Sequence, residues 1–167
     1  MTGPAIVLLL RPVPPHVSTH ILVPVDGSPL SEQALEVALE ENPGAHLTAL
    51  HVIDPTDLGY SYYPFDSVAE FREEPLHGSE EWYDRAEEFA EELFEHVEEV
   101  ADEYDADLVT ELVIGDPAQA IVRYAKDYDV DHVIVGSHGR GEDTTITLGS
   151  VTEAVAFRSP VRVTLVR

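Results

Sequence analysis

The sequence predicts an α/β domain built on a doubly wound, five-stranded parallel sheet with helices on both faces. Short apolar runs alternate with segments of helical periodicity along the whole chain, in the order βαβαβαβαβ. The runs are apolar on both faces, which is typical of parallel strands covered on both sides. With right-handed crossovers, this order gives a doubly wound sheet. The 167 residues are enough for one such domain.

The strands are predicted from five apolar runs, at residues 20–25, 47–53, 108–114, 132–135 and 161–166. After the first run, Ser28 is a good N-cap and Pro29 suits the first helical position, and Asn42-Pro43-Gly44 ends that helix. These turn residues separate the first strand from the second.

Three further helices complete the alternation. A long amphipathic helix is predicted from Ser79, with Trp82 and other apolar residues on one side and mostly Glu on the other. Gly115-Asp116-Pro117 begins the next helix, and Ser150 begins the last one. We therefore expect residues 20–167 to form the domain.

Two segments lie outside this regular pattern. Residues 1–19 contain Pro12, Pro14 and Pro15 and are expected to form an N-terminal extension. Residues 54–78 are a variable insert, long for a connection and rich in aromatic residues. A lid, an oligomer contact and a flexible insert are all open interpretations of this insert.

The composition is strongly acidic. Asp and Glu total 33 against 9 Lys and Arg, which gives a net charge of -24 at pH 7. Such a surface repels nucleic acid and anionic membranes, so neither is an expected partner. Because salt screens self-repulsion, we interpret the acidity as that of a halophilic, cytoplasmic protein, with an acidic functional patch as the alternative. The chain has no cysteine, which excludes disulfides and thiolate chemistry.

Ligands of doubly wound sheets bind at the carboxyl ends of the strands, near the point where the strand order reverses. Two loops should meet at this edge: Asp26-Gly27-Ser28 after the first strand, and residues 136–149 after the fourth. The second loop does not match the Walker loop, because the only lysine is Lys126. The first loop lacks the G-x-G-x-x-G of dinucleotide sites. What remains is Gly136, Gly139 and Gly149-Ser150, spaced G-x2-G-x9-G-S.

This spacing resembles the nucleotide-binding signature of the universal stress protein family, in its ATP-binding branch. The resemblance covers most of the chain from His20 to Arg167. It includes Ile21-Leu-Val-Pro-Val-Asp-Gly-Ser28, His51-Val-Ile-Asp54, the segment from Val135 to Gly139, Leu148-Gly-Ser-Val-Thr-Glu153, and Pro160-Val161.

The resemblance implies a homodimer formed through the last strand, with ATP, ADP or AMP lying across the carboxyl edge of the sheet. It implies that Asp26 meets the adenosine, that Pro24 and Val52 line the adenine pocket, and that Mg²⁺ or Mn²⁺ bridges phosphate oxygens. The signature residues carried over by position are Val135, Gly136, Gly139, Gly149, Ser150, Val151 and Thr152. Of these, Gly136 and Gly139 would let the backbone approach the ribose and phosphates, and the last four would hold the phosphates.

The residues themselves point to the same kind of site. Glycine lets a backbone amide approach an anion closely, and the amides at the start of the Ser150 helix carry a partial positive charge. Arg140 is the only cation in the loop, and His138 could add a hydrogen-bond donor. Both are candidate phosphate contacts.

Each candidate has a simpler interpretation. Ser150-Val-Thr-Glu153 is also the pattern of a capping box, in which Ser150 and Glu153 satisfy the helix end. Asp26 could be a turn residue ahead of the Ser28 cap, and His138 a solvated loop histidine. The loop acids Glu142 and Asp143 could touch a metal or be part of the acidic background. The histidines show no metal-binding spacing such as HExxH, so no protein-ligated metal is predicted.

The function predicted is that of an ATP-binding stress-response regulator, a homodimer with an unidentified protein partner. No nucleophile stands beside an evident base, so at most slow ATP hydrolysis or autophosphorylation is expected. The alternative is a dimeric interaction module with a vestigial nucleotide pocket. A nucleotide-dependent enzyme on the same architecture is the third interpretation.

Overall fold

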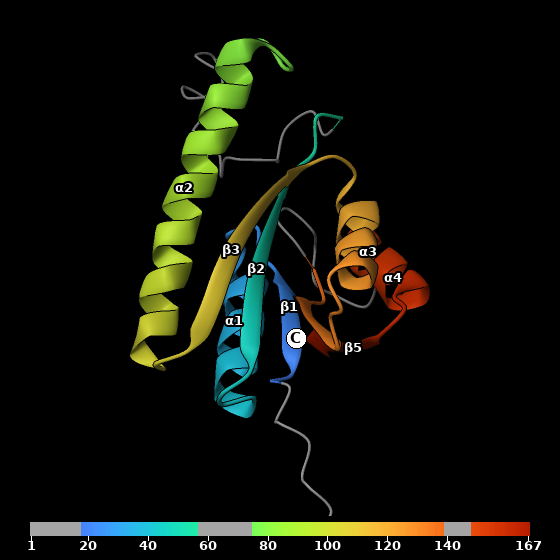
Figure 1. The fold of residues 1–167 in the computed structure, drawn as a ribbon. Helices are drawn as coiled ribbons and strands as arrows, with labels where there is room; N and C mark the ends of the chain where they lie inside the picture. The colour runs from blue at the N-terminus through green and yellow to red at the C-terminus, as the bar shows by residue number, and fades with distance from the viewer. Residues whose placement is uncertain (1–17, 57–74, 139–147) are drawn as a thin grey trace, which may run out of the picture.

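The computed structural model describes residues 18–56, 75–138 and 148–167 (Figure 1). Five strands and four helices alternate in the predicted order. The strands are β1 (His20–Pro24), β2 (His46–Ile53), β3 (Asp107–Ile114), β4 (His132–Gly136) and β5 (Arg162–Val166). The helices are α1 (Pro29–Glu41), α2 (Glu80–Glu103), α3 (Pro117–Asp127) and α4 (Ser150–Arg158).

The strands form one sheet in the order β3-β2-β1-β4-β5, and every neighbouring pair is parallel. The predicted five-stranded parallel sheet is therefore confirmed. From β1 the chain adds β2 and β3 on one side and then returns to add β4 and β5 on the other. The strand order thus reverses between β1 and β4, where a doubly wound sheet has its binding crevice.

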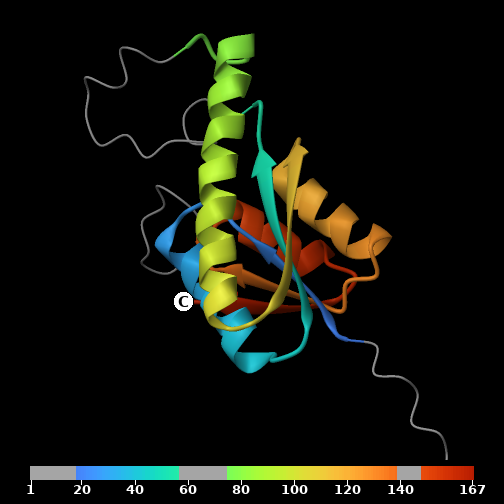
Figure 2. The same ribbon diagram turned by 60° about the vertical axis from the view of Figure 1, so that its left-hand side comes forward.

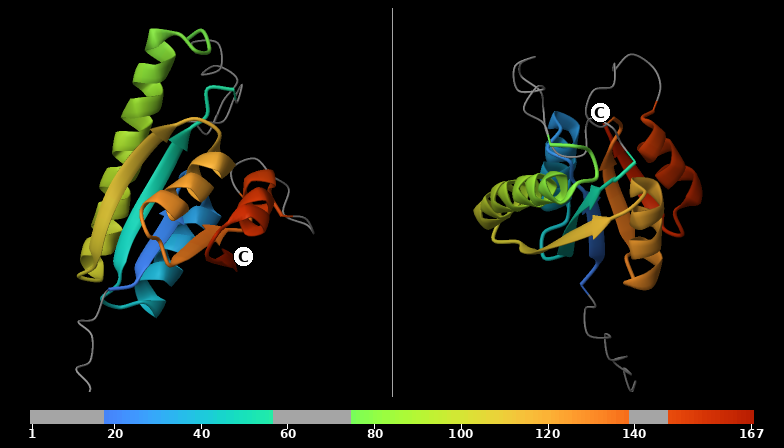
Figure 3. Two further views of the ribbon diagram at one scale, coloured as in Figure 1. Left: turned by 45° about the vertical axis from the view of Figure 1, so that its right-hand side comes forward. Right: turned by 90° about the horizontal axis from the view of Figure 1, so that it is seen from above.

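Helices cover both faces of the sheet (Figures 1 and 3). On one face, α1 and α2 bury Leu35 and Leu93 against Ile21 and Ile134. On the other face, α3 and α4 bury Ile121 and Val155 against strand residues such as Leu22. Figure 2 shows α2 running alongside β2 and β3. The two apolar layers fix the positions of the four helix ends relative to the strand ends.

The expectation that every strand is buried on both faces is wrong for the two edge strands. Every residue of β3 and β5 is at least partly exposed, whereas β4 is buried throughout. Val109 and Ile114 on β3 are 39% and 51% exposed. An edge strand has a neighbour on one side only, and α2 and α4 do not cover the outer strands completely.

Three segments named in the sequence analysis lie wholly or partly outside the described residues. They are the extension (of which 1–17 is not described), the insert (of which 57–74 is not described) and the glycine loop at 139–147. Within the described part, no helix is both long enough and apolar enough to cross a membrane.

Candidate functional site

The first part of the candidate site is the turn that follows β1. Asp26 accepts a hydrogen bond from the backbone N–H of Ser28 through Oδ1, at 2.9 Å. Gly27 takes a positive φ of 75°, which is accessible to glycine and rare for other residues. Ser28 then caps α1 by accepting from the N–H of Ser31 at 3.3 Å, as predicted. Asp26 therefore stabilises the turn, as its simpler interpretation predicts. The predicted contact of Asp26 with adenosine stays a prediction.

The second part is the end of β4, against which α1 packs closely. A Cβ on Gly136 would lie 2.9 Å from the backbone carbonyl carbon and oxygen of Leu30. Glycine at this position thus lets the first turn of α1 approach the strand, which is a packing role in addition to the one expected from the signature. The next residue, Ser137, donates its N–H to the carbonyl of Val166 at 2.7 Å. This bond ties the end of β4 to the end of β5.

The third part is the start of α4, which is fastened to the end of β4 by two hydrogen bonds. The N–H of Gly149 donates to the carbonyl of Ser137 at 2.9 Å. The hydroxyl of Thr152 donates to the carbonyl of Gly136 at 2.8 Å, and Thr152 is buried. The two halves of the glycine signature are therefore side by side, on either side of the undescribed 139–147 segment.

The amides at the start of α4 have no side-chain cap from the N-cap residue. The other helices are capped by Ser28, Ser79 and Asp116, each through a side-chain oxygen. In α4 the N-cap is Gly149, which has no side chain, and Ser150 is the first helical residue. The capping-box interpretation is therefore wrong, because Ser150 lies one position too late to cap. Within the described part of the chain no side-chain cap takes up these amide donors, which suits them to bind a ligand.

His138, beside this helix start, is a buried residue. Its side chain is 8% exposed, so the interpretation as a solvated loop histidine is wrong. Nδ1 lies 3.2 Å from the hydroxyl oxygen of Ser137. Nε2 is buried and has no hydrogen-bond partner in the described part of the chain. A buried polar atom without a partner is costly, and a ligand with a matching group would relieve that cost.

The remaining predicted residues lie at the same carboxyl edge of the sheet. Pro24 ends β1 and is half-buried, and Val52 is half-buried near the end of β2. Val135 is buried in β4, Val151 is half-buried in the first turn of α4, and Ser150 is exposed. Gly139 and Arg140 lie outside the described residues, as do Glu142 and Asp143. No hydrogen bond between described residues joins Asp26 to α4, so these two parts share an edge without touching through polar groups.

Two residues of this region were missed from sequence. Ser137 is buried and holds β5, α4 and the His138 ring through three hydrogen bonds. Leu30 sets the need for glycine at position 136. Ser137 directly follows an apolar strand, which could have indicated that it is buried. The contact between Gly136 and Leu30 could not be predicted in this way, because it forms only when α1 packs against β4. Among the residues with described positions, no three His, Asp or Glu side chains are arranged to hold a metal ion.

Comparisons with known proteins agree with this arrangement. A family model described as the universal stress protein family matches residues 18–167. A universal stress protein of Mycobacterium tuberculosis is 33% identical over 159 residues, which cover 92% of this chain and 45% of that protein. The chain thus spans about half the length of such mycobacterial relatives. One from Methanocaldococcus jannaschii is 30% identical over 151 residues, covering 88% of this chain and 93% of that protein.

Solved structures share the fold. The structure of the same M. jannaschii protein gives a TM-score of 0.71 at 31% identity, with 89% of this chain and 94% of that chain covered. A universal stress protein in complex with cAMP gives a TM-score of 0.59 at 26% identity, with coverages of 89% and 97%. An Arabidopsis thaliana family protein with AMP bound, at 19% identity and a TM-score of 0.60, covers 88% and 90% and supports the fold alone. Some proteins with this fold therefore bind adenine nucleotides.

Proposed function

This chain belongs to the universal stress protein family, and from that premise we propose that it binds ATP and acts as a nucleotide-dependent stress-response regulator. The observation that carries the proposal is the start of α4. Its amides have no side-chain cap, and two hydrogen bonds hold them against the end of β4, beside the point where the strand order reverses. The positive end of a helix dipole at this crevice suits a phosphate group.

The nucleotide would be held mainly by the backbone. Ser150, Val151 and Thr152 offer amides to the phosphates, and Gly149, whose own N–H is bound to the Ser137 carbonyl, lets the phosphates approach the backbone. Pro24 and Val52 offer apolar contacts to the adenine. Fixed amide dipoles matter in a chain of net charge -24, where few side chains are cationic. A bound Mg²⁺ or Mn²⁺ would take most of its ligands from phosphate oxygens and water, as Mg²⁺ commonly does. A universal stress protein solved in complex with cAMP, 26% identical to this chain, supports a nucleotide as the ligand, and ATP, ADP and AMP remain the alternatives.

We assign a regulatory role rather than a catalytic one. The described part of the site presents backbone donors for an anion, and its one hydroxyl–imidazole pair, Ser137 and His138, is buried at 1% and 8% exposure. Occupancy of the pocket would then be the signal that an unidentified protein partner reads, in a cytoplasm whose salt screens the acidic surface.

The edge of β5 is the surface proposed for homodimer formation. Phe157 on α4 is 82% exposed and Leu165 on β5 is 37% exposed, and Arg158, Arg162 and Arg167 offset the acidic surroundings. The opposite edge strand, β3, carries Asp107 and Glu111 beside the Glu-rich α2. Two copies can therefore approach through β5 with less charge repulsion than through β3.

The dimer proposal is tested by analytical ultracentrifugation. Phe157→Glu should convert a dimer into a monomer, whereas Ile114→Glu on β3 should leave the dimer intact. A monomeric parent chain, or a dimer lost only with the β3 variant, would contradict the proposed surface.

The nucleotide proposal is tested on the purified full chain in molar salt. The protein is denatured and any released nucleotide is identified by mass, and the melting temperature is then measured with and without ATP and Mg²⁺. A released adenine nucleotide, or a rise in melting temperature with ATP, is expected because a ligand that binds only the folded state stabilises it. If no nucleotide were released and ATP did not raise the melting temperature, the alternative of an interaction module with a vestigial pocket would be supported instead.

A further inference from the structure

We propose that the open edge of β3, the side that faces away from β2, docks an extended segment of a partner protein in which apolar residues alternate with Lys or Arg. In the described part of the chain, β3 pairs with β2 alone and lies at the border of the sheet beside α2 (Figures 1 and 2). The unpaired N–H and C=O groups of an edge strand accept an added strand. This inference goes beyond the nucleotide site and does not depend on it.

The backbone of β3 alternates between β2 and the open edge. The N–H of Gly115 donates to the carbonyl of Ile53 at 2.9 Å, so the odd-numbered residues before Gly115 direct their backbone groups toward β2. The even-numbered residues direct theirs outward. They are Leu108, Thr110, Leu112 and Ile114. Their N–H and C=O groups form the row with which an added strand would pair.

The side chains of these even-numbered residues lie on the face of the sheet that α2 covers. Leu108 packs against the core on that face, and the hydroxyl of Thr110 donates to Oε1 of Glu98 on α2 at 3.4 Å. Nearer the carboxyl end, Leu112 and Ile114 are apolar and are 37% and 51% exposed. Because neighbouring strands place the side chains of one face side by side, apolar residues of an added strand would cover this exposed area.

The opposite face of the same strand carries negative charge. Asp107 and Glu111 are exposed there, on either side of Val109, which is itself 39% exposed. Among the described residues, neither carboxylate pairs with a Lys or Arg, and Asp107 pairs with His46 at 2.8 Å. Lys or Arg at every second position of an added strand would lie beside these carboxylates.

The charge of the open edge favours a partner protein over a second copy of this chain. A second copy would bring its own Asp107 and Glu111, together with the Glu-rich α2, so two β3 edges repel each other. A basic, alternating strand instead presents apolar side chains to one face and cations to the other, because side chains alternate with period two. Acidic residues at an edge can also serve only to prevent pairing between copies, and the test separates that role from docking.

The test titrates the full chain with a fluorescent peptide that alternates Val and Arg, at the lowest salt concentration at which the chain stays folded. A control peptide has the same composition with all Val before all Arg, so it carries the same charge without the alternation. We expect the alternating peptide to bind at least about tenfold more tightly than the control peptide. Equal binding of the two peptides, or no binding of either, would overturn the inference.

A pair of charge-reversing variants tests the position of the peptide. Glu111→Arg should weaken binding of the alternating peptide by about tenfold or more, because like charges would then face each other across the two strands. Glu36→Arg, at an exposed position on α1, changes the net charge equally and should leave the affinity within about twofold. Equal losses in the two variants would mean that the net charge of the chain attracts the peptide, which would overturn the inference.

Hydrogen exchange of backbone amides locates the peptide without any substitution. The outward amides of Thr110, Leu112 and Ile114 should become protected when the peptide binds. Those of Val109 and Glu111 should be protected already, because they bond to β2. Outward amides that were protected without peptide would overturn the inference, because another part of the chain or a second copy would then occupy the edge. Peptide binding without new protection at these amides would overturn it too.

Discussion

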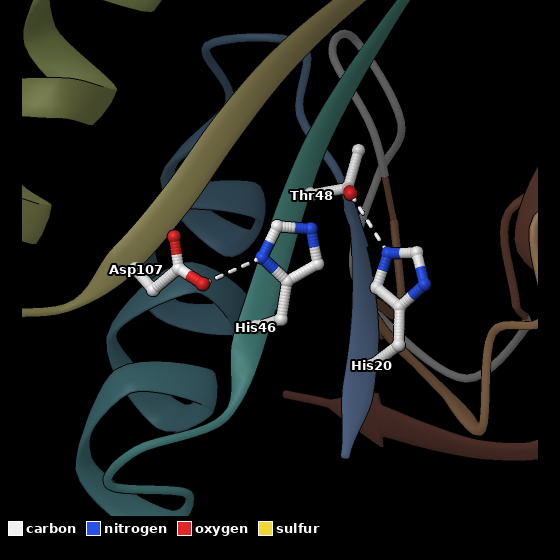
Figure 4. Close-up of polar contacts among 4 residues, drawn as sticks. All are labelled: His20, His46, Thr48 and Asp107. Atoms are coloured by element: carbon white, nitrogen blue, oxygen red, sulfur yellow. Dashed lines mark hydrogen bonds and ion pairs between the residues drawn. The ribbon is translucent and has the colours of Figure 1, made fainter. Parts of the chain in front are cut away.

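Polar groups at the two ends of the sheet differ in whether they have hydrogen-bond partners within the protein. At the amino end, the chain satisfies most of them itself (Figure 4). His20 bonds to the Tyr128 carbonyl at 3.0 Å and to the Thr48 hydroxyl at 2.9 Å, and His46 bonds to Asp107 at 2.8 Å. At the carboxyl end, the α4 amides lack a side-chain cap and the Nε2 atom of His138 lacks a described partner.

This difference indicates that the polar groups at the amino end have a structural role and that those at the carboxyl end are available to a ligand. Histidines with partners at both nitrogens, such as His20, hold strands and loops together and offer little to a ligand. Donors without protein partners cost stability unless a ligand or solvent takes them up. Unpartnered donors that gather at the crevice between β1 and β4 are what a binding site predicts, and His132 is the exception at the amino end. The following changes are ordered from the largest expected effect to the smallest.

Ser150→Asp should have the largest effect: it should lower the affinity for ATP and raise the stability of the folded protein. Ser150 is exposed at the first position of α4, so the new carboxylate fits without repacking. Two unit charges about 5 Å apart repel by about 3 kcal/mol at an effective dielectric constant of about 20, so ATP affinity should fall more than about a hundredfold. The same charge should stabilise the helix by about 0.3–1 kcal/mol. Calorimetry and urea unfolding check the two signs.

Ser150→Asn is the neutral control for that change and should bind ATP nearly as well as the parent. If Ser150→Asp bound ATP with the affinity of Ser150→Asn, the phosphates would not lie at the start of α4.

A matched pair of substitutions compares the two ends directly. Thr152→Val and Thr48→Val each remove one buried hydroxyl, with its bond to the Gly136 carbonyl or to the His20 ring. Both should lower the free energy of unfolding by about 1–3 kcal/mol. Only Thr152→Val should also weaken ATP binding, by about tenfold, because it loosens α4 against β4. Equal effects of the two variants on ATP affinity would contradict the claim that only the carboxyl end of the sheet contributes to ATP binding.

The smallest expected effect concerns His132, the exception at the amino end. Burial, and then the positive charge of Arg162 on β5, lower the pKa of His132, while Glu41 on α1 opposes the shift. Its Nε2 bonds to the Thr164 hydroxyl and its buried Nδ1 has no described partner. Below the ordinary histidine value of 6.5 the unfolded chain binds this proton more readily than the folded chain, so stability should fall as pH falls from there.

Urea unfolding from pH 7.5 down to pH 5 checks the sign, with His132→Gln as the comparison. The difference in stability between parent and variant should shift in the variant's favour as pH falls. A difference that did not change with pH would mean that His132 titrates alike in both states.

Much of the fold could be predicted because its signals are local. Alternating periodicity gave the element order, and Ser28, Ser79 and Asp116 marked three helix starts correctly because each cap acts within one turn. The exposure of β3 could not be predicted in this way. Its apolar composition resembles that of the central strands, and its place at an edge depends on the strand order of the whole sheet.

The candidate site shows the same division. The glycine spacing identified the right strand end and helix start. The capping box failed because the bond from Gly149 to the Ser137 carbonyl, a contact far apart in sequence, sets where α4 begins. His138 was misjudged because loop histidines are usually solvated, and its burial comes from Ser137 being tied to both β5 and α4.

The most direct measurement maps ATP onto the backbone by amide chemical shifts of ¹⁵N-labelled protein during a titration with ATP and Mg²⁺. We predict the largest shifts at Gly149, Ser150, Val151 and Thr152. The amides of Ala118 and Gln119 should not move, because they begin α3, a helix on the same face that Asp116 caps. Shifts centred on α3, or at the amino end around His46, would contradict the claim that the open start of α4 is the phosphate site.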